Sequence, residues 1–600
     1  MSVNDTGVTY DGWRNLEGGM DSADADLVSP NQASLLVNCQ IRDGFPATRP
    51  AFLQRTLTFE GGIQSAFEDG LFQGAAPYVS LTENSSIVLS VSGKQYQIVL
   101  SDDEYLVRDI TPTDSEGISG GNPNIEQVWI EQAEDFAIIQ DGNNKPVIWD
   151  GVSSKYAEVG ELPSGSVISY GQGRVWMASV NQRYFSAGDL VFGDAGTATY
   201  NNRDAVYKWT ENTYLSTGGS FIVPHRKGKI TAMAFLANLD TALGDGPLIV
   251  GTPKGLFSVN TPIDRTVWSI LQYPPQTIAH LGSGPTGPRQ MINVNGDLWY
   301  RGIEGIYSFS MARRDFRSWI NTPMSEEIRR LMEADTEVLL PYGSLANWNN
   351  YLLSTVQPTR IQDHGVVWAG LGVLDFAPIS RMRRRSDPAW AGLWTGLRVL
   401  QVLSVEVADQ GRCFLICLDT DDKIALWEIR EDERFDGQEK AIASIIESRL
   451  LKGQDNGNSL KKLEVGALWM DRLAGTVTFT TQYRPDYDLF WQDWHTWSEC
   501  ANLEDCSPEC DGPKTLQEQY RARLRLPEPD NTVDAVTGTP FNQGHYFQVR
   551  VKIAGHFQLR YFRTKMRHVH EDPMGAYPLD GTCSDNTGCL EDIFEYSSET

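Results

Sequence analysis

Short apolar segments separated by turn residues dominate the chain from about residue 60 to residue 435. Each segment ends at Asp, Asn or Gly, and a second apolar segment follows it. Such pairs predict β-hairpins whose turns contain glycine or aspartate. The clearest pairs are 136–141 with 146–150, 174–180 with 184–189, 248–251 with 255–259, 297–300 with 305–309, and 413–418 with 424–429.

The predicted hairpins recur at a spacing of roughly 40 to 60 residues, which is typical of four-stranded propeller blades. The segments GLFSV (255–259) and GIYSF (305–309) come closest to a true repeat. A β-sandwich array would give similar hairpins and is the alternative fold. We therefore predict an all-β fold with a β-propeller-like central domain over residues 61–435.

Residues 1–60 are predicted to form an N-terminal arm with one short helix. Ser29 is a suitable N-cap, Pro30 fits the first helical position, and Gln32 completes a capping box before an apolar stripe. The arm otherwise contains little apolar surface. A chain without residues 1–50 is therefore expected to fold, and the arm is expected to contact a neighbouring subunit.

A second helix is predicted over residues 322–332. Glu326 and Glu327 lie in its first turn, where acidic side chains interact favourably with the helix dipole. Its apolar face consists of Met324, Ile328, Leu331 and Met332. A single helix among strands commonly covers the edge of a sheet, and we expect this role here.

Residues 436–600 are predicted to form a C-terminal antiparallel β domain with cysteine-rich loops and an acidic tail. Residues 520–526 alternate Arg with Ala or Leu, which predicts a half-buried strand with a basic outer face. Residues 546–553 also alternate, and Gly555 is expected to turn the chain into a second strand at 557–561. From residue 571 the chain has eight acidic residues and no Lys or Arg, which is typical of a solvated or partner-docking extension.

The cysteines fall into two groups. Cys39, Cys413 and Cys417 stand among apolar residues and are predicted to be buried free thiols. The other five are candidates for disulfide bonds that join loops, and because five is odd, at least one is expected to stay unpaired or to bond elsewhere: Cys500, Cys506, Cys510, Cys583 and Cys589. Their spacing does not match the paired CxxC motifs of structural zinc sites. His568 and His570 could add ligands, so zinc is the less favoured alternative, and we predict no metal or cofactor.

The formal net charge of −27 argues against a protein that grips nucleic acid along its length. Clusters of arginine interrupt this acidic background, and the densest is predicted to be a subunit interface: Arg381, Arg383, Arg384 and Arg385. We favour docking onto an acidic protein surface over docking onto DNA. Pairing of these arginines with nearby acids such as Asp387 is the alternative.

Sequence motifs of enzymes and membrane proteins are not found. The chain has no GxSxG elbow, no P-loop, no HExxH and no GxGxxG between a strand and a helix. Nothing selects a catalytic pair from its 78 acidic residues, so we predict a protein that is not an enzyme. Its apolar runs are far shorter than the roughly 18 residues of a spanning helix. The first residues also lack the basic and apolar regions of a Sec signal.

The first fifty residues contain an ordered series of short motifs: Leu16-Glu17-Gly18-Gly19-Met20-Asp21-Ser22, Val28-Ser29-Pro30-Asn31-Gln32-Ala33-Ser34, Val37-Asn38, Asp43-Gly44 and Thr48-Arg49-Pro50. This series resembles the start of tail nozzle proteins (tail tubular protein B) of short-tailed bacteriophages. The resemblance covers about 40 residues strongly, and residues 544–563 agree with the family only in style.

This resemblance implies a propeller with added β domains and a structural role in the phage tail. Six copies would form a ring below an adaptor or portal protein, with tail fibres or spikes as further partners. The protein would be assembled in the host cytoplasm and would reside in the virion tail, where DNA passes through the ring during ejection without specific binding. Carboxylates on the wall would repel phosphates, so the duplex would slide.

Two other functions fit a soluble propeller. The first alternative is a receptor-binding tail-tip propeller that recognises host surface glycans through exposed Trp and Tyr. The second is a propeller enzyme that cleaves glycans. Ring assembly would favour the nozzle, glycan affinity of monomers or trimers would favour the receptor-binding protein, and turnover that depends on one carboxylate would favour the enzyme.

Overall fold

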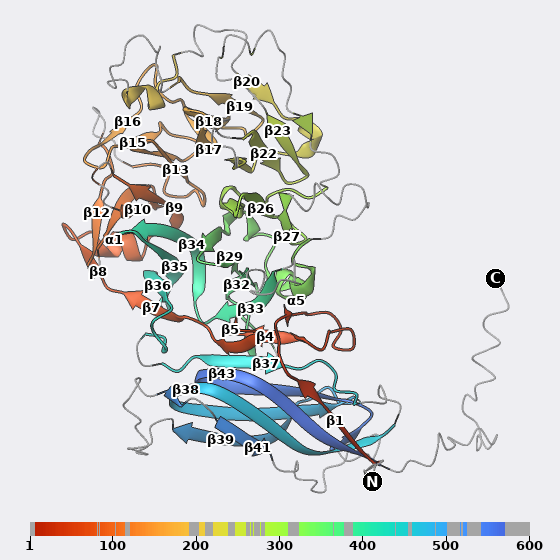
Figure 1. Cartoon of the computed structure of the whole chain (residues 1–600). Helices are drawn as coiled ribbons and strands as arrows, with labels where there is room; N and C mark the ends of the chain where they lie inside the picture. The colour runs from red at the N-terminus through yellow and green to blue at the C-terminus, as the bar shows by residue number, and fades with distance from the viewer. Residues whose placement is uncertain are drawn as a thin grey trace, which may run out of the picture.

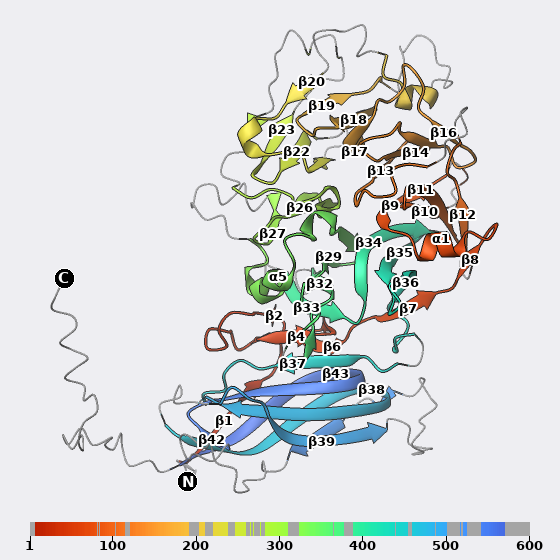
Figure 2. The ribbon, with the colours of Figure 1, turned by 180° about the vertical axis from the view of Figure 1, so that it is seen from behind.

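The fold is all-β, as predicted, with a β-propeller and a second, strongly curled sheet that lies below it in Figure 1. Figure 2 shows the same two parts from behind. The computed structural model describes residues 7–80, 82, 85–101, 104–113, 120–190, 203–210, 220–237, 246–259, 265, 268, 276–277, 282–309, 323–363, 365–376, 388–437, 440–453, 459–486, 488–500, 516–517, 520–524 and 542–569.

All five predicted hairpins are confirmed, and each lies in a different blade of the propeller. They are β14 (Phe136–Gln140) with β15 (Val147–Trp149), β18 (Arg174–Ser179) with β19 (Tyr184–Ala187), β22 (Leu248–Thr252) with β23 (Gly255–Val259), β26 (Asp297–Arg301) with β27 (Ile306–Ser308), and β35 (Gln410–Leu418) with β36 (Ile424–Arg430). The recurrence in the sequence is therefore the repeat of the blades.

Six blades are separate sheets within the described residues. The first contains β9 (Phe72–Val79), β10 (Ser85–Val91), β11 (Lys94–Leu100) and β12 (Tyr105–Asp109). The next four begin with the inner strands β13 (Trp129–Ala133), β17 (Gly165–Gly171), β21 (Ala232–Phe235) and β25 (Met291–Val294). Three of these four end with β16 (Ser154–Tyr156), β20 (Ser220–Ile222) and β24 (Gln276–Thr277). The last separate blade begins with β34 (Arg398–Val407).

A further four-stranded unit fills the ring between the blades of β25 and β34. It consists of β28 (Leu345–Trp348), β29 (Tyr351–Val356), β32 (Gly370–Asp375) and β33 (Ala389–Thr395). Its strand β33 also pairs with N-terminal strands, so this unit belongs both to the propeller and to the curled sheet. Apolar clusters fill the interfaces between neighbouring blades, for example Trp176 stacked on Trp268 with ring centroids 5.6 Å apart.

The ring is closed by β7 (Ala51–Arg55), which is the outer strand of the last blade. It pairs antiparallel with β36, and Phe52 lies opposite Ile429. Below this pairing, the buried Glu428 carboxylate accepts hydrogen bonds from Arg412 at 2.7 Å and from Arg55 at 2.7 Å. Partial burial would raise the pKa of Glu428, but the two arginines lower it overall. The next strand, β8 (Leu57–Phe59), runs parallel to β12 of the first blade.

Two long strands organise the curled sheet. They are β38 (Lys461–Pro485) and β43 (Phe547–His568), which pair antiparallel over nearly their whole length with several register shifts. Such bulges increase strand twist and explain the curl. The shorter strands are β37 (Ala443–Glu447), β39 (Gln492–Cys500), β40 (Leu516–Gln517), β41 (Tyr520–Leu524) and β42 (Gln543–Gly544).

The hairpin predicted around Gly555 is wrong, because β43 continues through this residue as one strand. Gly555 has a φ of 129° and lies at a register shift, where a Cβ atom would come within 3.0 Å of Val477. The glycine therefore allows a close approach to β38 instead of a turn. The predicted strand with a basic outer face is confirmed as β41, where Arg521 and Arg523 are exposed and Leu524 is buried.

The N-terminal segment consists of strands, so the helix predicted from Ser29 is wrong. The strands are β1 (Val8–Trp13), β2 (Gly19–Met20), β3 (Gln32–Ala33), β4 (Leu35–Val37), β5 (Cys39–Arg42) and β6 (Phe45–Thr48). All three residues of β4 are buried, because β4 pairs with β33 of the propeller on one side and with β37 of the curled sheet on the other. Burial on both faces favours an extended strand over the locally capped helix.

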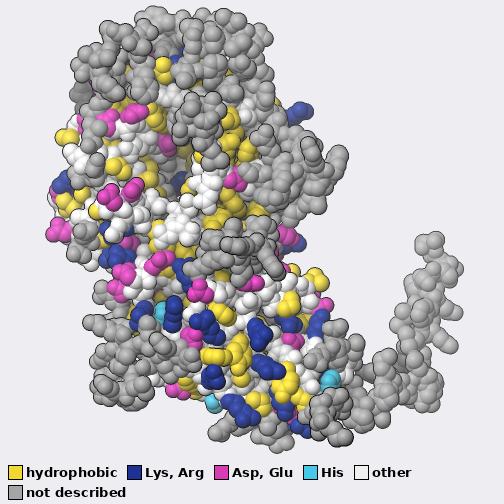
Figure 3. Space-filling model, in the orientation of Figure 1, with side chains coloured by type: hydrophobic (Ala, Val, Ile, Leu, Met, Phe, Trp, Pro, Cys, Tyr) yellow, Lys and Arg dark blue, Asp and Glu magenta, His cyan; other side chains and the backbone are white. Residues whose placement is uncertain are grey.

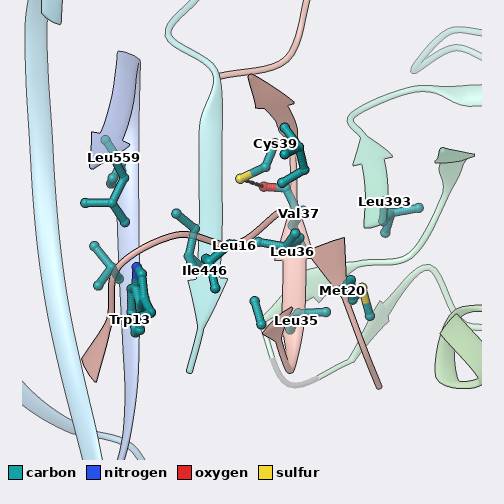
Figure 4. Packing of buried hydrophobic residues seen from close by; sticks show 14 of the residues in the cluster. Trp13, Leu16, Met20, Leu35, Leu36, Val37, Cys39, Leu393, Ile446 and Leu559 are labelled. Carbon is teal, nitrogen blue, oxygen red and sulfur yellow. Dashed lines mark hydrogen bonds between the residues drawn. The ribbon is translucent and has the colours of Figure 1, made fainter. Parts of the chain in front are cut away.

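The N-terminal segment also contributes core side chains, contrary to the expectation of a polar arm. Figure 4 shows Trp13 beside Leu559 of the curled sheet, and Leu36 and Val37 between Ile446 of β37 and Leu393 of β33. The premise that this segment contains little apolar surface is therefore wrong, whereas the folding of a chain without residues 1–50 stays a prediction. The boundaries predicted near residues 60 and 435 stay predictions.

Arg49 joins the propeller to the curled sheet. Its guanidinium is buried and forms a bidentate pair with Asp436, with distances of 2.9 and 2.7 Å, while Nε donates to Asn38 Oδ1 at 2.9 Å. Asn38 Oδ1 also accepts from the Thr395 amide of β33, and Asn38 Nδ2 donates to the Ala443 carbonyl of β37 at 2.8 Å. The side chains of Asn38 and Arg49, both in the N-terminal segment, thus connect the propeller with the curled sheet.

The helical elements are short. They are α1 (Gln64–Glu68), η1 (Arg203–Tyr207), η2 (His225–Lys227), η5 (Pro288–Gln290), η6 (Glu326–Ile328), α5 (Arg329–Ala334) and η7 (Leu340–Tyr342). The apolar face predicted for residues 322–332 is confirmed in η6 and α5, where Ile328, Leu331 and Met332 are buried. Across the described residues, helices long and apolar enough to cross a membrane are not found.

Replacement of Arg49 tests the junction. Arg49→Ala removes the buried cation that pairs with the half-buried Asp436 carboxylate and one of the two donors to Asn38 Oδ1, so the free energy of unfolding should fall by about 3–5 kcal/mol. The matched control is Arg108→Ala, which removes an exposed pair with Glu60 at 3.0 Å and should cost less than about 1 kcal/mol. Urea unfolding of both variants measures the difference, and equal losses would contradict the role given to Arg49.

Candidate functional site

The residues predicted as sites lie mostly outside the described part of the chain. This holds for Arg381, Arg383, Arg384 and Arg385, and for Cys506, Cys510, Cys583 and Cys589. Cys500, at the end of β39, is disulfide-bonded, and the pairing among the five C-terminal cysteines stays a prediction. The predicted free thiols Cys39, Cys413 and Cys417 are confirmed as free and buried, and burial raises the pKa of Cys39 to about 12.

Metal ligands do not gather among the described residues, where no group of three or more His, Cys, Asp or Glu side chains could hold an ion. His568 is described, and its Nδ1 lies 2.5 Å from the hydroxyl of Ser459. His570 lies outside the described residues, so the zinc alternative is not tested.

A basic and aromatic surface covers the outer side of the curled sheet. Side chains of β1, β38, β41 and β43 share one side because their residues are directly opposite in register: Trp469 pairs with Arg521 and Tyr561. Figure 3 shows Lys and Arg side chains gathered over this lower sheet among hydrophobic ones. We call this surface the cationic face, and it consists of Tyr10, Trp469, Arg521, Arg523, Tyr561 and Arg563.

The arginines of the cationic face stack on its aromatic rings. The Arg521 guanidinium lies 4.0 Å from the ring centroid of Trp469, and that of Arg563 lies 4.1 Å from Tyr10. Trp469 also meets Tyr561 edge to face at 5.5 Å. Each cation–π contact holds an arginine against the sheet while its hydrogen-bond donors stay accessible to a partner.

The free positive charge of the cationic face is concentrated on three residues. Arg521, Arg523 and Arg563 are exposed and form no ion pair with the described residues. Lys565 and Arg567, further along β43, share Glu464 at 3.0 and 2.6 Å. Partial burial would raise the pKa of Glu464, but these two cations lower it overall. These three arginines, which have no acidic partner in the described part of the chain, therefore offer a docking site for negative charge.

A groove of about 1270 Å³ runs beside the cationic face. Residues of β1, β38 and β43 line it together with the start of β6, and its walls include Tyr10, Phe45, Trp469 and Tyr561. Arg560 spans it by pairing with Asp471 and stacking 4.6 Å from the Phe45 ring. The groove is thus lined by aromatic faces with charged groups at their edges.

The second cavity is the central channel of the propeller, with a volume of about 480 Å³. Within the described residues, seven inner strands or the turns that precede them line it, namely β9, β13, β17, β21, β25, β28 and β34. Most lining side chains are apolar or neutral, and the charged ones are Glu131 and Arg289.

Glu131, on β13, has no positively charged partner among the described residues. Its Oε1 accepts one long hydrogen bond of 3.4 Å from the Tyr170 amide of β17. Burial raises the pKa of Glu131 to about 7, and this single hydrogen bond opposes the shift only weakly. Burial therefore favours the protonated form of this carboxyl group more than in an exposed glutamate.

Sequence reasoning found the basic outer side of β41 but missed the rest of the cationic face. The alternation of Arg521 and Arg523 is visible in the sequence, whereas Tyr10 and Arg563 come from opposite ends of the chain. Glu131 and Arg289 have no sequence signal, because only the closure of the ring turns them towards the same channel.

The sequence matches no protein-family model and no curated protein. Solved structures that resemble it include YCF48 bound to D1 peptide (10% identity, 64% of this chain and 98% of that chain, TM-score 0.32) and the computationally designed Ika8 protein (11%, 63% and 100%, 0.30). Trypanosoma rangeli sialidase in complex with the inhibitor DANA is another (8%, 90% and 95%, 0.29). The sialidase is an enzyme, but a likeness this distant carries no argument about the activity of this chain.

The pH dependence of stability tests the environment of Glu131. The unfolded chain loses this proton near pH 4.5 and the folded chain near pH 7, so the folded state binds more protons between these values. The free energy of unfolding should therefore fall as pH rises through this window. Glu131→Gln should remove that fall and exceed the wild type by about 1–3 kcal/mol at pH 8.

Urea unfolding at pH 5 and pH 8 measures this effect. The control is Glu406→Gln, which changes an exposed carboxylate on β34 and should leave the pH dependence of the wild type unaltered. If the free energy of unfolding of Glu131→Gln depends on pH as it does in the wild type, the pKa of the Glu131 carboxyl group is not raised by the fold.

Proposed function

We propose that this protein is a structural subunit of a phage tail, a nozzle-like ring component through which DNA leaves the particle. On this proposal it is not an enzyme, and its surfaces serve assembly. The ring would contain six copies and would meet adaptor or portal-proximal proteins on one side.

The observation that carries this proposal is the position of the motif residues that resemble the nozzle family. Gly19 packs against the Trp390 backbone, where a Cβ atom would lie 2.4 Å from its carbonyl oxygen. Gln32 Nε2 donates to Glu327 at 3.1 Å, and Asn38 with Arg49 joins the two sheets. The motifs thus serve the junction of a propeller with an added β domain, which is the architecture that the resemblance implies.

The cationic face supports a role in assembly. The chain as a whole carries a net charge of −27, so a second copy carries an excess of acidic side chains. Arg521, Arg523 and Arg563, which form no ion pair with any described residue, complement such acidic side chains, and charge complementarity directs docking and orientation. The cationic face takes the place of the Arg381–Arg385 segment as the described candidate for a subunit contact.

The DNA conduit of this proposal lies between copies of the chain. The propeller channel has a volume of about 480 Å³, equal to about 16 water molecules at about 30 Å³ each. A DNA duplex, whose major groove alone is about 12 Å wide, does not fit into it. A ring of subunits is therefore needed to form an opening for the duplex.

The groove beside the cationic face favours one alternative, a receptor-binding tail-tip protein. Tyr10, Trp469 and Tyr561 present aromatic rings at a groove of about 1270 Å³, and such rings provide stacking surfaces for sugars. Binding of host surface glycans by monomers or trimers would support this alternative over the nozzle.

Charge reversal tests whether the cationic face mediates assembly. The triple variant Arg521→Glu, Arg523→Glu, Arg563→Glu should associate about tenfold more weakly than the wild type, with the largest effect at low salt. The control reverses three exposed charges on the propeller, Lys94→Glu, Arg226→Glu and Arg360→Glu, and should assemble normally. Sedimentation velocity at two salt concentrations measures both. Normal assembly of the first variant at low salt would show that the cationic face is not part of the subunit contact.

Binding of duplex DNA separates protein docking from DNA gripping. The assembled protein should not retain double-stranded DNA at physiological salt, because an exposed run of arginine contacts would add drag during ejection. A filter-binding assay over a range of salt concentrations measures retention. Submicromolar, salt-sensitive binding that is lost in the triple variant would assign the cationic face to DNA instead.

A further inference from the structure

Arg289 carries an unpaired positive charge inside the propeller. It lies on η5 beside the inner strand β25 and lines the central channel. Among the described residues it has no acidic partner, and its Nε atom is buried without a hydrogen bond. Arg289 as a whole is half-buried, and a half-buried guanidinium without a counter-ion among the described residues favours binding of a negatively charged group.

A neighbouring side chain fixes the position of Arg289. Gln401, on the inner strand β34, bridges to the first blade by donating to the Ala75 carbonyl at 2.7 Å and accepting from the Ala75 amide at 3.0 Å. The same Oε1 atom accepts from Arg289 Nη1 at 2.5 Å. The ring of Phe72, 5.9 Å from the guanidinium carbon, supports its other side. Arg289 is therefore held in place although its charge is unsatisfied.

We propose that the propeller channel is a binding site for a small anion with carboxylate or phosphate oxygens, anchored by Arg289. Nη1 is engaged by Gln401, which leaves the edge formed by Nε and Nη2 without protein partners in the described part of the chain. Because Nε has almost no accessible surface, Nη2 is the donor of this edge that an oxygen of an anionic group can reach. The channel volume of about 480 Å³ lies within the range of small-ligand pockets.

Apart from the carboxyl group of Glu131, the remaining lining is uncharged and suits a compact ligand with an apolar part. Trp129, Met233 and Phe235 contribute apolar surface, and the hydroxyl of Ser169 and the amide of Asn293 contribute polar groups. Asn293 Nδ2 donates one hydrogen to the Phe235 carbonyl at 2.8 Å and keeps a second hydrogen for a ligand oxygen. This inference is independent of the proposed tail function, because it concerns the inside of one propeller.

Calorimetric titration of the full-length protein tests the site. The probes are sodium citrate and sodium phosphate, each at constant ionic strength set with sodium chloride. At least one should bind saturably with one site per chain, and which one binds distinguishes carboxylate from phosphate. Arg289→Gln should weaken that binding about tenfold or more. Arg289→Lys keeps the positive charge and should bind the probe with an affinity between those of the wild type and Arg289→Gln. It replaces Arg289→Gln in the test if that variant does not fold.

Two controls locate the binding. Arg226→Gln changes an exposed arginine on the propeller and should bind like the wild type. The triple variant of the cationic face should also bind like the wild type. Absence of saturable binding by both probes, or binding that Arg289 variants leave unchanged, would overturn the proposal. Loss of binding in the triple variant would move the anion site to the cationic face.

Discussion

The buried guanidinium of Arg49 is the interaction on which the arrangement of the two bodies depends. It links Asp436, which follows the last blade, to Asn38, which contacts the propeller at Thr395 and the curled sheet at Ala443. Asn38 has a φ of 55°, a backbone conformation that asparagine tolerates better than most residues, so both its backbone and its amide are used. Because β7 follows directly and closes the ring, the same few residues connect the ring closure with the junction.

Local patterns were sufficient to predict the propeller but not its junction with the curled sheet. The five hairpins were predicted because strands, turn residues and spacing lie within short windows of sequence. The segment from Ser29 to Val37 was predicted as a helix because capping signals are local, whereas β4 is a strand owing to partners more than 300 residues away. The local sequence likewise predicts a turn at Gly555. Only the register with β38 shows that this glycine allows a close approach between two strands.

The candidate sites differ in how far the sequence could reveal them. Alternation within β41 predicts its basic side, but the unpaired state of Arg521 and Arg523 depends on which acidic residues the fold brings near. Glu131 and Arg289 are single charged residues among seventy-eight acids and fifty-one bases, and neither lies in a motif. Their positions in the channel follow from ring closure, which depends on contacts between the two ends of the propeller. Whether a charged side chain in a cavity or on a sheet has a partner is therefore set by the fold and cannot be seen in the local sequence.

The central claim is that the junction presents the curled sheet for ring assembly. Electron microscopy of the purified full-length protein tests this claim most directly. The account predicts closed rings with sixfold symmetry in which the curled sheets lie at the contacts between subunits and the propellers retain their separate channels. Monomers or trimers at the same concentration, or rings in which the curled sheets face solvent, would contradict it.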